Sequence, residues 1–397
     1  MLRQEAIDTA EKYYLPVFGR LPIVLDHGQG CKVYDMDGRE FIDFLDGIAV
    51  NCLGYNHPVI VKAVAEQAAK LMHCSNLFYT EIQAKAVRVI SEITGMDRVF
   101  LTNSGAESNE GALKLARKYG HQKGGDKKYR IITAKMSFHG RTMATLTATG
   151  QPHYQEGYNP LPGGYEYVPF GDIEALEAAM GDDVCGVMLE PIQGEGGVHV
   201  PPEGYLKRVR ELCDKHDALL IFDEIQTGVG RCGAWFEYMN VNVKPDILTF
   251  AKGIGGGFPM GGFAVPEKLA RVFAPGDHGG TFGGNALACA VAYAVVTTLK
   301  AEGIVPKVKE KGEYFLSKLR ELQAKYPEKI VEVRGRGLLV GFETSKPGAP
   351  IVASCLEQGV IVNCTVGNVI RMVPPLIVSK EEIDKVVAAL DKALENF

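Results

Sequence analysis

Between residues 58 and 299, short apolar runs alternate with stretches whose apolar residues recur at helical spacing. This alternation is typical of a parallel sheet, because its strands are buried on both faces and are connected by crossover helices. The predicted strands are residues 98–102, 130–134, 186–189, 218–222, 246–251 and 262–265. The sequence therefore predicts an α/β fold whose larger part is built around a mostly parallel sheet.

A chain of 397 residues is too long for one compact core, so two domains are expected. After residue 299 the pattern changes to a Lys/Glu-rich helix, a strand pair at residues 330–343 and another around residues 360–378. A terminal helix follows and opens with the capping box Ser379-x-x-Glu382. An N-terminal strand–turn–strand is expected to join this smaller part. We predict a large domain, residues 58–299, and a small domain formed by residues 1–57 together with residues 300–397.

Charge, cysteine spacing and hydropathy exclude several functional classes. A net charge of −5 argues against a general binder of nucleic acid or anionic membranes. The nine cysteines include no Cys-x-x-Cys pair, so no metal site is predicted. Residues 279–299 are uncharged, but their strongly apolar part is about half the roughly 20 residues that a membrane span needs. We expect a buried helix there, in a cytoplasmic protein without a signal peptide.

Lys252 follows the apolar run 247–251 and opens a glycine-dense stretch. A lysine at the end of a buried strand is unusual, because an ammonium group is costly to desolvate without a partner. The functional interpretation is an imine between Lys252 and an aldehyde cofactor, since desolvated lysines with a lowered pKa do this chemistry. By itself, a lysine that reaches from a strand end to solvent is the commoner case. The interpretation therefore depends on the neighbouring motifs.

Asp223 ends another predicted strand. Carboxylates at the carboxyl ends of parallel strands face the ligand crevice of an open α/β sheet. A pyridoxal cofactor needs an anion against its ring nitrogen, and Asp223 fits that role. Gln226 is predicted to reach the phenolic oxygen of the ring. The alternative is an aspartate that only caps a loop, which is common at turns.

Ser104-Gly105-Ala106-Glu107 follows the first predicted strand and has the form of a capping box. The simplest interpretation is a helix start. The functional interpretation uses the same backbone N–H groups and the positive end of the helix dipole to bind a phosphate. Gly105 would let the backbone approach that anion closely.

Three further side chains indicate recognition of an aromatic ring and of carboxylates. Phe138 follows a predicted strand and can stack on a cofactor ring, while Arg141 offers a planar fork to a carboxylate. Arg371 stands among apolar residues, where a buried arginine requires an anionic partner. That partner is either a substrate carboxylate or Glu195, and the sequence leaves both open.

Residues 228–233 match the dinucleotide fingerprint Gly-x-Gly-x-x-Gly. Five residues separate the match from the preceding strand, and no run of helical periodicity follows it at once. The fingerprint requires a direct turn from strand to helix, so a dinucleotide site is not predicted. The chain has no Walker loop, His-Glu-x-x-His motif or nucleophile elbow.

Together these motifs resemble the class III aminotransferases, which have the aspartate aminotransferase fold, over nearly the whole chain from about Tyr13. Within that class, residues 75–81 are most similar to acetylornithine aminotransferases. The resemblance implies fold type I of the pyridoxal-phosphate enzymes, with a seven-stranded sheet in the large domain and pyridoxal 5'-phosphate as cofactor. The segments that carry it are residues 104–106, 138–142, 190–195, 223–228, 252–253 and 281–285.

The resemblance also implies a role for each cofactor residue. Lys252 carries the cofactor and Asp223 pairs with its ring nitrogen, as the residues themselves suggest. Thr281 reaches the phosphate of the neighbouring subunit's cofactor, so that the enzyme is an obligate homodimer with shared active sites. The predicted cofactor-binding residues are Ser104, Gly105, Ala106, Phe138, Asp223, Gln226, Lys252 and Thr281.

For the substrates, the resemblance assigns Arg141 to the α-carboxylate of acetylornithine and Arg371 to that of the glutamate/2-oxoglutarate pair. Glu195 is similar to a carboxylate that pairs with this second arginine when the bound substrate has no carboxylate there. Many acetylornithine enzymes carry a serine just before the equivalent of Thr281. Here the residue is Gly280, which offers no side chain to a substrate.

The predicted reaction moves the δ-amino group of N2-acetyl-L-ornithine to 2-oxoglutarate, as in arginine biosynthesis. The same machinery would serve ornithine, 4-aminobutyrate, putrescine or succinylated diamines, and a cofactor-dependent decarboxylase is a further alternative. A catalytically silent pyridoxal-binding regulator is disfavoured, because binding alone would not require two substrate arginines.

Overall fold

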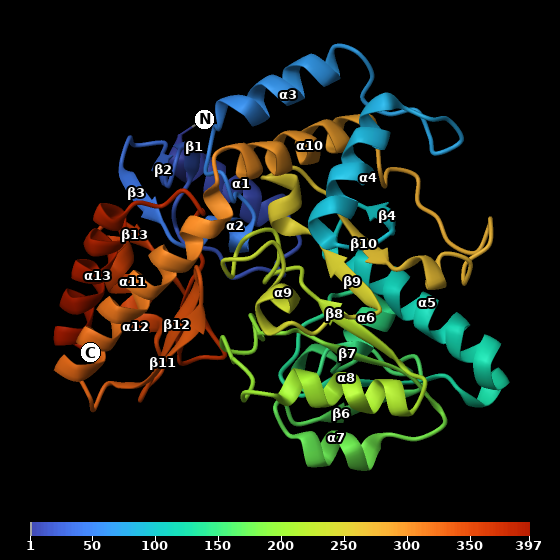
Figure 1. The fold of residues 1–397 in the computed structure, drawn as a ribbon. Helices are drawn as coiled ribbons and strands as arrows, with labels where there is room; N and C mark the ends of the chain where they lie inside the picture. Colours follow the sequence, from blue (N-terminus) through green and yellow to red (C-terminus); the bar gives the residue numbers. More distant parts are fainter. Residues whose placement is uncertain (1) are drawn as a thin grey trace.

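The computed structural model describes residues 2–397, so Met1, the first residue of the predicted small domain, lies outside it. Its largest sheet has seven strands in the order β4-β10-β9-β8-β7-β5-β6 (Figure 1). β10 is antiparallel to both neighbours, while the other pairs are parallel, which confirms the predicted fold class. The strands are β4 (Arg98–Thr102), β5 (Arg130–Ala134), β6 (Tyr165–Val168), β7 (Val184–Leu189), β8 (Leu219–Asp223), β9 (Ile247–Phe250) and β10 (Gly261–Val265).

Six of these strands lie within two residues of their predicted positions. The sequence patterns do not single out β6. Its sequence Tyr-Glu-Tyr-Val lies at the edge of the sheet, and its first three residues are only half-buried. It therefore lacks the continuous apolar run that marks a strand buried on both faces.

Alternate side chains of the central strands enter two different cores. Ile221 of β8 packs in a cluster with Leu113 of α5, on one face of the sheet. Leu220 and Phe222 belong to the larger cluster on the other face, together with Val209 of α8. The helices of this part of the chain are α3 (Pro58–Ala68), α4 (Glu81–Thr94), α5 (Gly105–Gly124), α6 (Met143–Ala148), α7 (Ile173–Ala179), α8 (Tyr205–Lys215), α9 (Glu237–Val241) and α10 (Ala286–Ala301).

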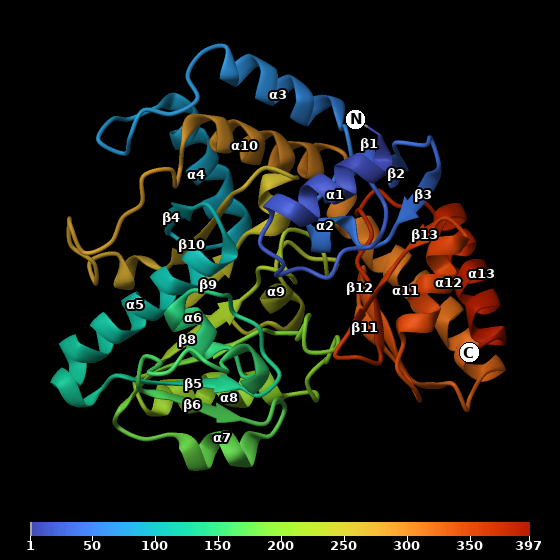
Figure 2. The same ribbon diagram turned by 180° about the vertical axis from the view of Figure 1, so that it is seen from behind.

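Two four-stranded sheets, β1-β2-β3-β13 and β11-β12-β15-β14, lie to one side of the large sheet (Figures 1 and 2). β3 pairs in parallel with β13, so the N-terminal strands join the C-terminal part of the chain. We propose residues 57/58 and 299/300 as the domain boundaries. The elements are α1 (Arg3–Tyr13), β1 (Leu25–Gln29), β2 (Lys32–Asp35), β3 (Glu40–Asp43), α2 (Asp46–Ala49), α11 (Ile304–Lys325), β11 (Ile330–Arg336), β12 (Leu339–Thr344), α12 (Ala349–Glu357), β13 (Val360–Ile361), β14 (Asn363–Thr365), β15 (Val369–Met372) and α13 (Lys380–Glu395).

α10 is the buried helix expected within the uncharged stretch 279–299. Asn285 caps its first turn, because its Oδ1 accepts a hydrogen bond from the Ala288 N–H at 2.8 Å. The helix packs against α3 and α4. Within residues 2–397 no single helix has the length and apolarity to cross a membrane, and α10 with α11 meets these criteria only as a pair bent by 70°.

The segment α2 (Asp46–Ala49) is a turn of left-handed backbone. Its φ angles are 57°, 61°, 68° and 61°, and only Gly47 adopts such angles without a penalty from Cβ. Asp46 Oδ2 accepts a hydrogen bond from Arg231 Nη2 at 3.1 Å, and both side chains are buried. Val50, which follows the turn, lines the cavity described below. An internal ion pair therefore holds a strained turn beside that cavity.

Candidate active site

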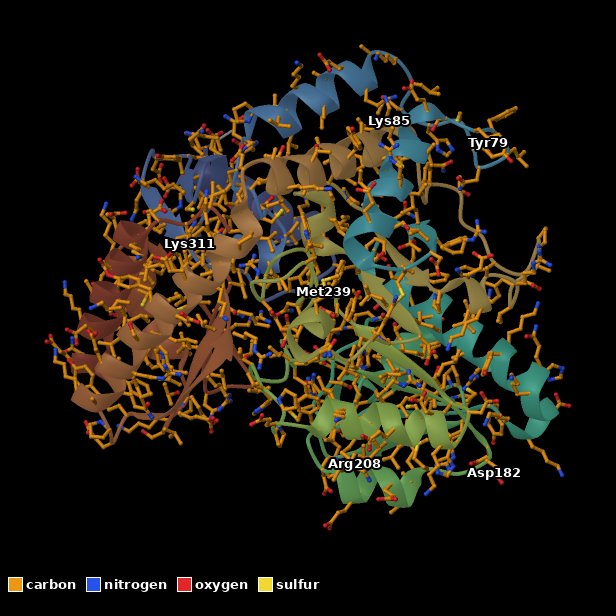
Figure 3. All side chains as sticks on the ribbon, viewed as in Figure 1. Tyr79, Lys85, Asp182, Arg208, Met239 and Lys311 are labelled. Carbon is orange, nitrogen blue, oxygen red and sulfur yellow. The ribbon has the colours of Figure 1, made fainter. Side chains whose placement is uncertain are left out.

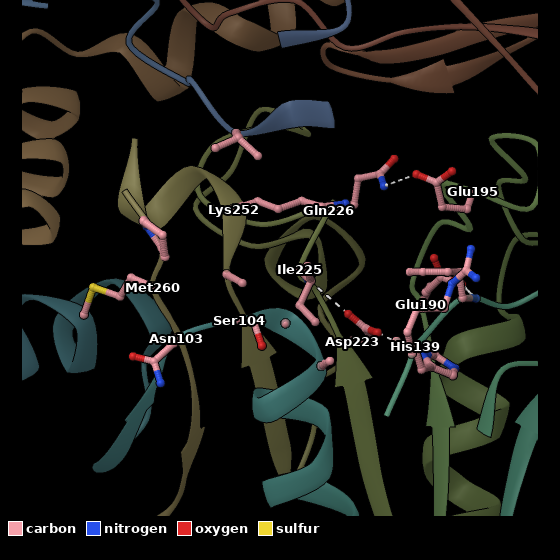
Figure 4. A pocket seen from close by; sticks show the side chains of 18 of the residues that line it. Asn103, Ser104, His139, Glu190, Glu195, Asp223, Ile225, Gln226, Lys252 and Met260 are labelled. Atoms are coloured by element: carbon pink, nitrogen blue, oxygen red, sulfur yellow. Dashed lines mark hydrogen bonds and ion pairs between the residues drawn. The ribbon is translucent and has the colours of Figure 1, made fainter. Parts of the chain in front are cut away.

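A cavity of about 450 Å³ opens at the carboxyl ends of β4, β5, β7, β8 and β9, a volume typical of small-molecule sites. In Figure 4, Lys252, Ser104 and Asn103 stand on one side of this hollow, and Glu190, Glu195 and His139 on the other. The predicted site residues that line it are Ser104, Gly105, Ala106, Phe138, Arg141, Glu195, Asp223, Gln226 and Lys252.

Lys252 follows β9 and has left-handed backbone, with a φ of 50°. Burial lowers the pKa of its amine to about 8, and the nearby Glu195 carboxylate only partly opposes this shift. With that pKa, about a tenth of the amine is neutral at pH 7, far more than for an ordinary lysine. The neutral amine is the form that attacks an aldehyde or takes up a proton.

This pKa predicts how the apoenzyme should capture pyridoxal 5'-phosphate. Because only the neutral Lys252 amine reacts, the rate should rise about fivefold between pH 7 and 8 and level off above about pH 9. Stopped-flow absorbance between about pH 7 and 9.5 would measure it. A rate that still rises steeply at the upper end would indicate an ordinary lysine pKa and contradict the prediction.

Asp223 is buried at the end of β8, with its carboxylate held on both oxygens. Oδ2 accepts a hydrogen bond from Asn109 Nδ2 at 2.8 Å, and Nδ1 of His139 lies 2.8 Å from the same oxygen. Oδ1 accepts from the Ile225 N–H at 3.1 Å. No sequence pattern predicts a role for Asn109 or His139. His139 stands inside the segment 138–142, whereas Asn109 lies on the helix that follows Ser104.

Glu190, a second carboxylate for which no sequence pattern predicts a role, connects two segments of the site. Its Oε2 accepts from the Phe138 N–H at 3.1 Å, and its Oε1 accepts from the Gly194 N–H at 3.2 Å. Burial raises the pKa of Glu190 to about 7; His139 opposes this shift and Asp223 adds to it. Glu190 therefore links the loop of Phe138 to the loop that carries Glu195.

Arg371 on β15 is fully buried and contacts the cavity residue Glu195. Its Nη1 donates to Glu195 Oε1 at 2.6 Å and to Gln226 Oε1 at 3.0 Å, and its Nε donates to Asn363 Oδ1 at 3.1 Å. Within residues 2–397, Nη2 is buried without a hydrogen-bond partner. Burial alone would raise the pKa of Glu195, but Arg371 and Lys252 outweigh it and hold this pKa below its usual value. The sequence left two anionic partners open for Arg371, a substrate carboxylate and Glu195. In the structure Arg371 contacts Glu195.

The N-terminus of the 20-residue helix α5 faces the same cavity. Ser104 Oγ accepts from the Glu107 N–H at 3.2 Å, as a capping box requires. The Glu107 carboxylate accepts from the Asn103 N–H at 2.7 Å, one residue before the expected partner. A Cβ on Gly105 would stand only 2.7 Å from Ile225 Cδ1, so the close approach of the backbone here needs glycine. Such a cradle fits a phosphate.

Thr281 and Gly280 lie outside the cavity and are exposed. Thr281 lines a separate small hollow together with Phe78. Asn76 Nδ2 donates to the Gly283 carbonyl oxygen at 2.9 Å and ties the two segments together. The role predicted for Thr281 therefore requires a second subunit, and it remains a proposal.

The residues of the cavity fit pyridoxal 5'-phosphate. They bring together an amine of lowered pKa, a buried carboxylate, the N-terminus of a long helix and the aromatic ring of Phe138. These groups match the aldehyde, the ring nitrogen, the phosphate and the ring face of that cofactor. The fold and the cavity thus define a pyridoxal-phosphate enzyme of fold type I.

Comparison with known proteins places the chain within that class. The family aminotransferase class III matches residues 15–394. The chain is 50% identical to the acetylornithine aminotransferase of Methanocaldococcus jannaschii over 397 residues, 100% of both chains. The ornithine aminotransferase of Toxoplasma gondii ME49 superposes with a TM-score of 0.96 at 34% identity, covering 100% of this chain and 96% of that one. For the acetylornithine aminotransferase of Elizabethkingia anophelis the TM-score is 0.89 at 34% identity, covering 100% of each. The chain belongs to the class III aminotransferases, which use pyridoxal 5'-phosphate.

Proposed function

We propose that the enzyme transfers the δ-amino group of N2-acetyl-L-ornithine to 2-oxoglutarate, giving N-acetyl-L-glutamate 5-semialdehyde and L-glutamate, a step of arginine biosynthesis. The observation that carries this proposal is the Arg371–Glu195 ion pair beside Lys252. One cavity must accept glutamate, whose reacting carbon bears a carboxylate, and then an ω-amine, whose reacting carbon bears none. A buried arginine with a removable carboxylate partner serves both substrates.

Arg371 and Glu195 differ in how tightly their side chains are held, as an exchange of carboxylate partners on Arg371 requires. The Arg371 side chain is 0% exposed, whereas the Glu195 side chain keeps 24% of its surface exposed. Arg371 is also fixed by Asn363 at its Nε. Glu195 can therefore turn away and leave Nη1 to the α-carboxylate of glutamate. Nη2, which has no partner among residues 2–397, would be the second donor of a bidentate contact.

The other side chains divide the chemical work. Bound pyridoxal 5'-phosphate supplies an electron sink for the carbon that loses a proton. Lys252 Nζ in its neutral form takes that proton and returns it, since its lowered pKa keeps a reactive fraction near neutral pH. Asp223, oriented by Asn109 and His139, provides a fixed negative charge for the ring nitrogen. Gly105 and Ala106 line the cavity at the N-terminus of α5, where their N–H groups would hold the phosphate.

The choice of amino donor has two candidates. The relative with 50% identity over its whole length bears the name acetylornithine aminotransferase, which supports N2-acetyl-L-ornithine. The solved structure with the TM-score of 0.96 is an ornithine aminotransferase, which keeps free ornithine as the second candidate. Gly280 contributes no side chain that would distinguish them.

A panel of half-reactions tests this function. The purified holoenzyme is mixed in turn with acetylornithine, ornithine, succinyldiaminopimelate and 4-aminobutyrate, and the loss of the visible cofactor band is followed. Fast bleaching by acetylornithine alone is expected. Fast bleaching by another amine only would move the substrate assignment. A protein that shows no visible band after pyridoxal 5'-phosphate is added would overturn the proposal.

We propose further that two copies form a homodimer with shared active sites. Leu77, Phe78 and Tyr79 are 86%, 65% and 102% exposed, and Phe282, next to Thr281, is 60% exposed. Figure 3 shows Tyr79 at the periphery of the molecule. Clustered apolar side chains of this size favour burial against a partner, and a second copy here would bring its Thr281 toward a cavity. Light scattering should give twice the chain mass, and a monomer at micromolar concentration would contradict the proposal.

We also propose that the enzyme acts in the cytoplasm. All nine cysteines are free, and seven of them are buried. Free buried thiols are typical of a reducing compartment. Cell fractionation with immunodetection would test this proposal, and recovery outside the cytoplasmic fraction would reject it.

A further inference from the structure

Tyr154 contacts both aromatic and cationic residues of the predicted site, although no motif points to it. The Arg141 guanidinium lies 3.9 Å from the centroid of the Tyr154 ring and 5.6 Å from that of Phe138. The Tyr154 and Phe138 rings meet edge to face, with centroids 5.8 Å apart and an interplanar angle of 77°. We propose that Tyr154 is a specificity-determining residue, which positions Arg141 to receive the carboxylate of the amino donor. This inference rests on the proposed function.

Arg141 needs such a support because it is exposed, and a long exposed side chain has many rotamers available to it. Ordering a free arginine side chain costs up to about 2 kcal/mol of conformational entropy. A substrate carboxylate that must itself order the arginine therefore binds more weakly. A cation–π contact uses the face of the guanidinium and leaves its N–H edge free for a bidentate contact. Tyr154 therefore orders Arg141 before the substrate arrives.

The turn that carries Tyr154 is fixed to the site. Tyr154 ends the short 3-10 turn η2 (Pro152–Tyr154), which is flanked by two glutamines that bind backbone carbonyl oxygens. Gln151 is buried, and its Nε2 donates at 3.0 Å to the carbonyl of Ser137, the residue before Phe138. Gln155 Nε2 donates to the Thr149 carbonyl at 2.9 Å. The ring of Tyr154 is thus held at a set position relative to the loop that carries Phe138 and Arg141.

Tyr154 also lines a second hollow of about 490 Å³, and Glu195 lines this hollow as well as the main cavity. The two spaces therefore adjoin. Arg141 and Lys252 both line the main cavity, so we expect a donor whose amine reaches Lys252 to place its far carboxylate against the guanidinium that Tyr154 supports.

The test compares two amines that differ only in the carboxylate. N2-acetyl-L-ornithine carries it, and N-acetyl-1,4-diaminobutane has the same chain without it. The ratio of their kcat/KM values isolates recognition of the carboxylate. For the wild type we expect a ratio on the order of ten to a hundred, the effect of a charge-assisted hydrogen-bonded pair. In Tyr154→Leu most of this preference should vanish, mainly through a higher KM for acetylornithine.

Two further variants complete the test. Tyr154→Phe keeps the ring face and should keep the ratio, while Tyr158→Leu removes an exposed tyrosine nearby and should leave both substrates unchanged. The proposal is overturned if Tyr154→Leu retains the wild-type ratio, because a merely structural role slows both amines alike. It is also overturned if Tyr154→Phe loses the ratio as Tyr154→Leu does. Failure of the proposed function would look different: the wild type itself would not turn over acetylornithine, and the inference about Tyr154 would fall with it.

Discussion

Replacement of Lys252 by alanine is expected to abolish transamination, with turnover reduced to below about one part in ten thousand. Under the proposed function, the variant loses both the group that anchors the cofactor and the base that moves the proton. No other lysine lines the cavity, among the residues that the structure describes. Glutamate half-reactions followed in the visible range would measure the loss, and a variant with normal turnover would reject the assignment.

A control variant and a measurement of the bound cofactor distinguish loss of the Lys252 amine from loss of the folded structure. Lys311, which lies on α11 and does not line the cavity, also has a pKa lowered by burial, and its Nζ donates to the Leu376 carbonyl at 2.9 Å. Lys311→Ala should therefore retain activity. After borohydride reduction, the wild type should carry the cofactor mass on the peptide that contains Lys252. Lys252→Ala should lack this mass while it still binds the cofactor non-covalently through the phosphate cradle.

The fold could be predicted from the sequence because its signals are local. Strands such as β7 and β8 are buried on both faces, so continuous apolar runs mark them. The terminal helix α13 begins at Ser379, where both hydrogen bonds of the predicted capping box are present. The pair predicted within residues 360–378 divides between two sheets: β13 joins the N-terminal strands, and β14 and β15 join the other sheet. Pairing between distant segments leaves no local pattern, so the sequence could not show that division.

In the site, too, the features with a local sequence signal could be predicted, and those that depend on contacts between distant segments could not. Lys252 and Asp223 could be predicted because a charged residue directly after a buried strand is visible in the sequence itself. Asn109, His139 and Glu190 act through contacts with residues 30 or more positions away, such as Glu190 with Phe138. These supporting contacts depend on how the strands are ordered, which a single sequence does not contain. The cleft was therefore predictable, and the network that orients its carboxylates was not.

Replacement of Arg231 by leucine is expected to lower the free energy of unfolding by about 3–5 kcal/mol. The guanidinium binds Asp46 Oδ2 at 3.1 Å and the Leu338 carbonyl at 3.2 Å, and it also binds the Pro374 carbonyl. Its loss leaves a buried carboxyl and two carbonyl groups without a donor, beside a left-handed turn that already stores strain. Urea titration would measure the change. Arg208→Leu, which removes an exposed arginine paired with Glu211, should change the free energy of unfolding by no more than about 0.5 kcal/mol.

The pH dependence of the stability lost in Arg231→Leu shows which of the broken contacts causes the loss. Burial raises the pKa of Asp46, and Arg231 is the main influence that opposes it, so the pKa should rise further in Arg231→Leu. A carboxyl whose pKa is higher in the folded than in the unfolded state contributes stability to the folded protein at low pH. This contribution is lost as the pH rises through the folded pKa. The deficit of the variant should therefore be smaller at about pH 5 than at about pH 8. Adding Asp46→Asn, which removes the charge and tolerates left-handed backbone, should recover part of the stability and flatten this pH dependence. A deficit that is equal at both pH values would mean that the two carbonyl contacts, and not the buried carboxyl, account for the stability that Arg231 provides.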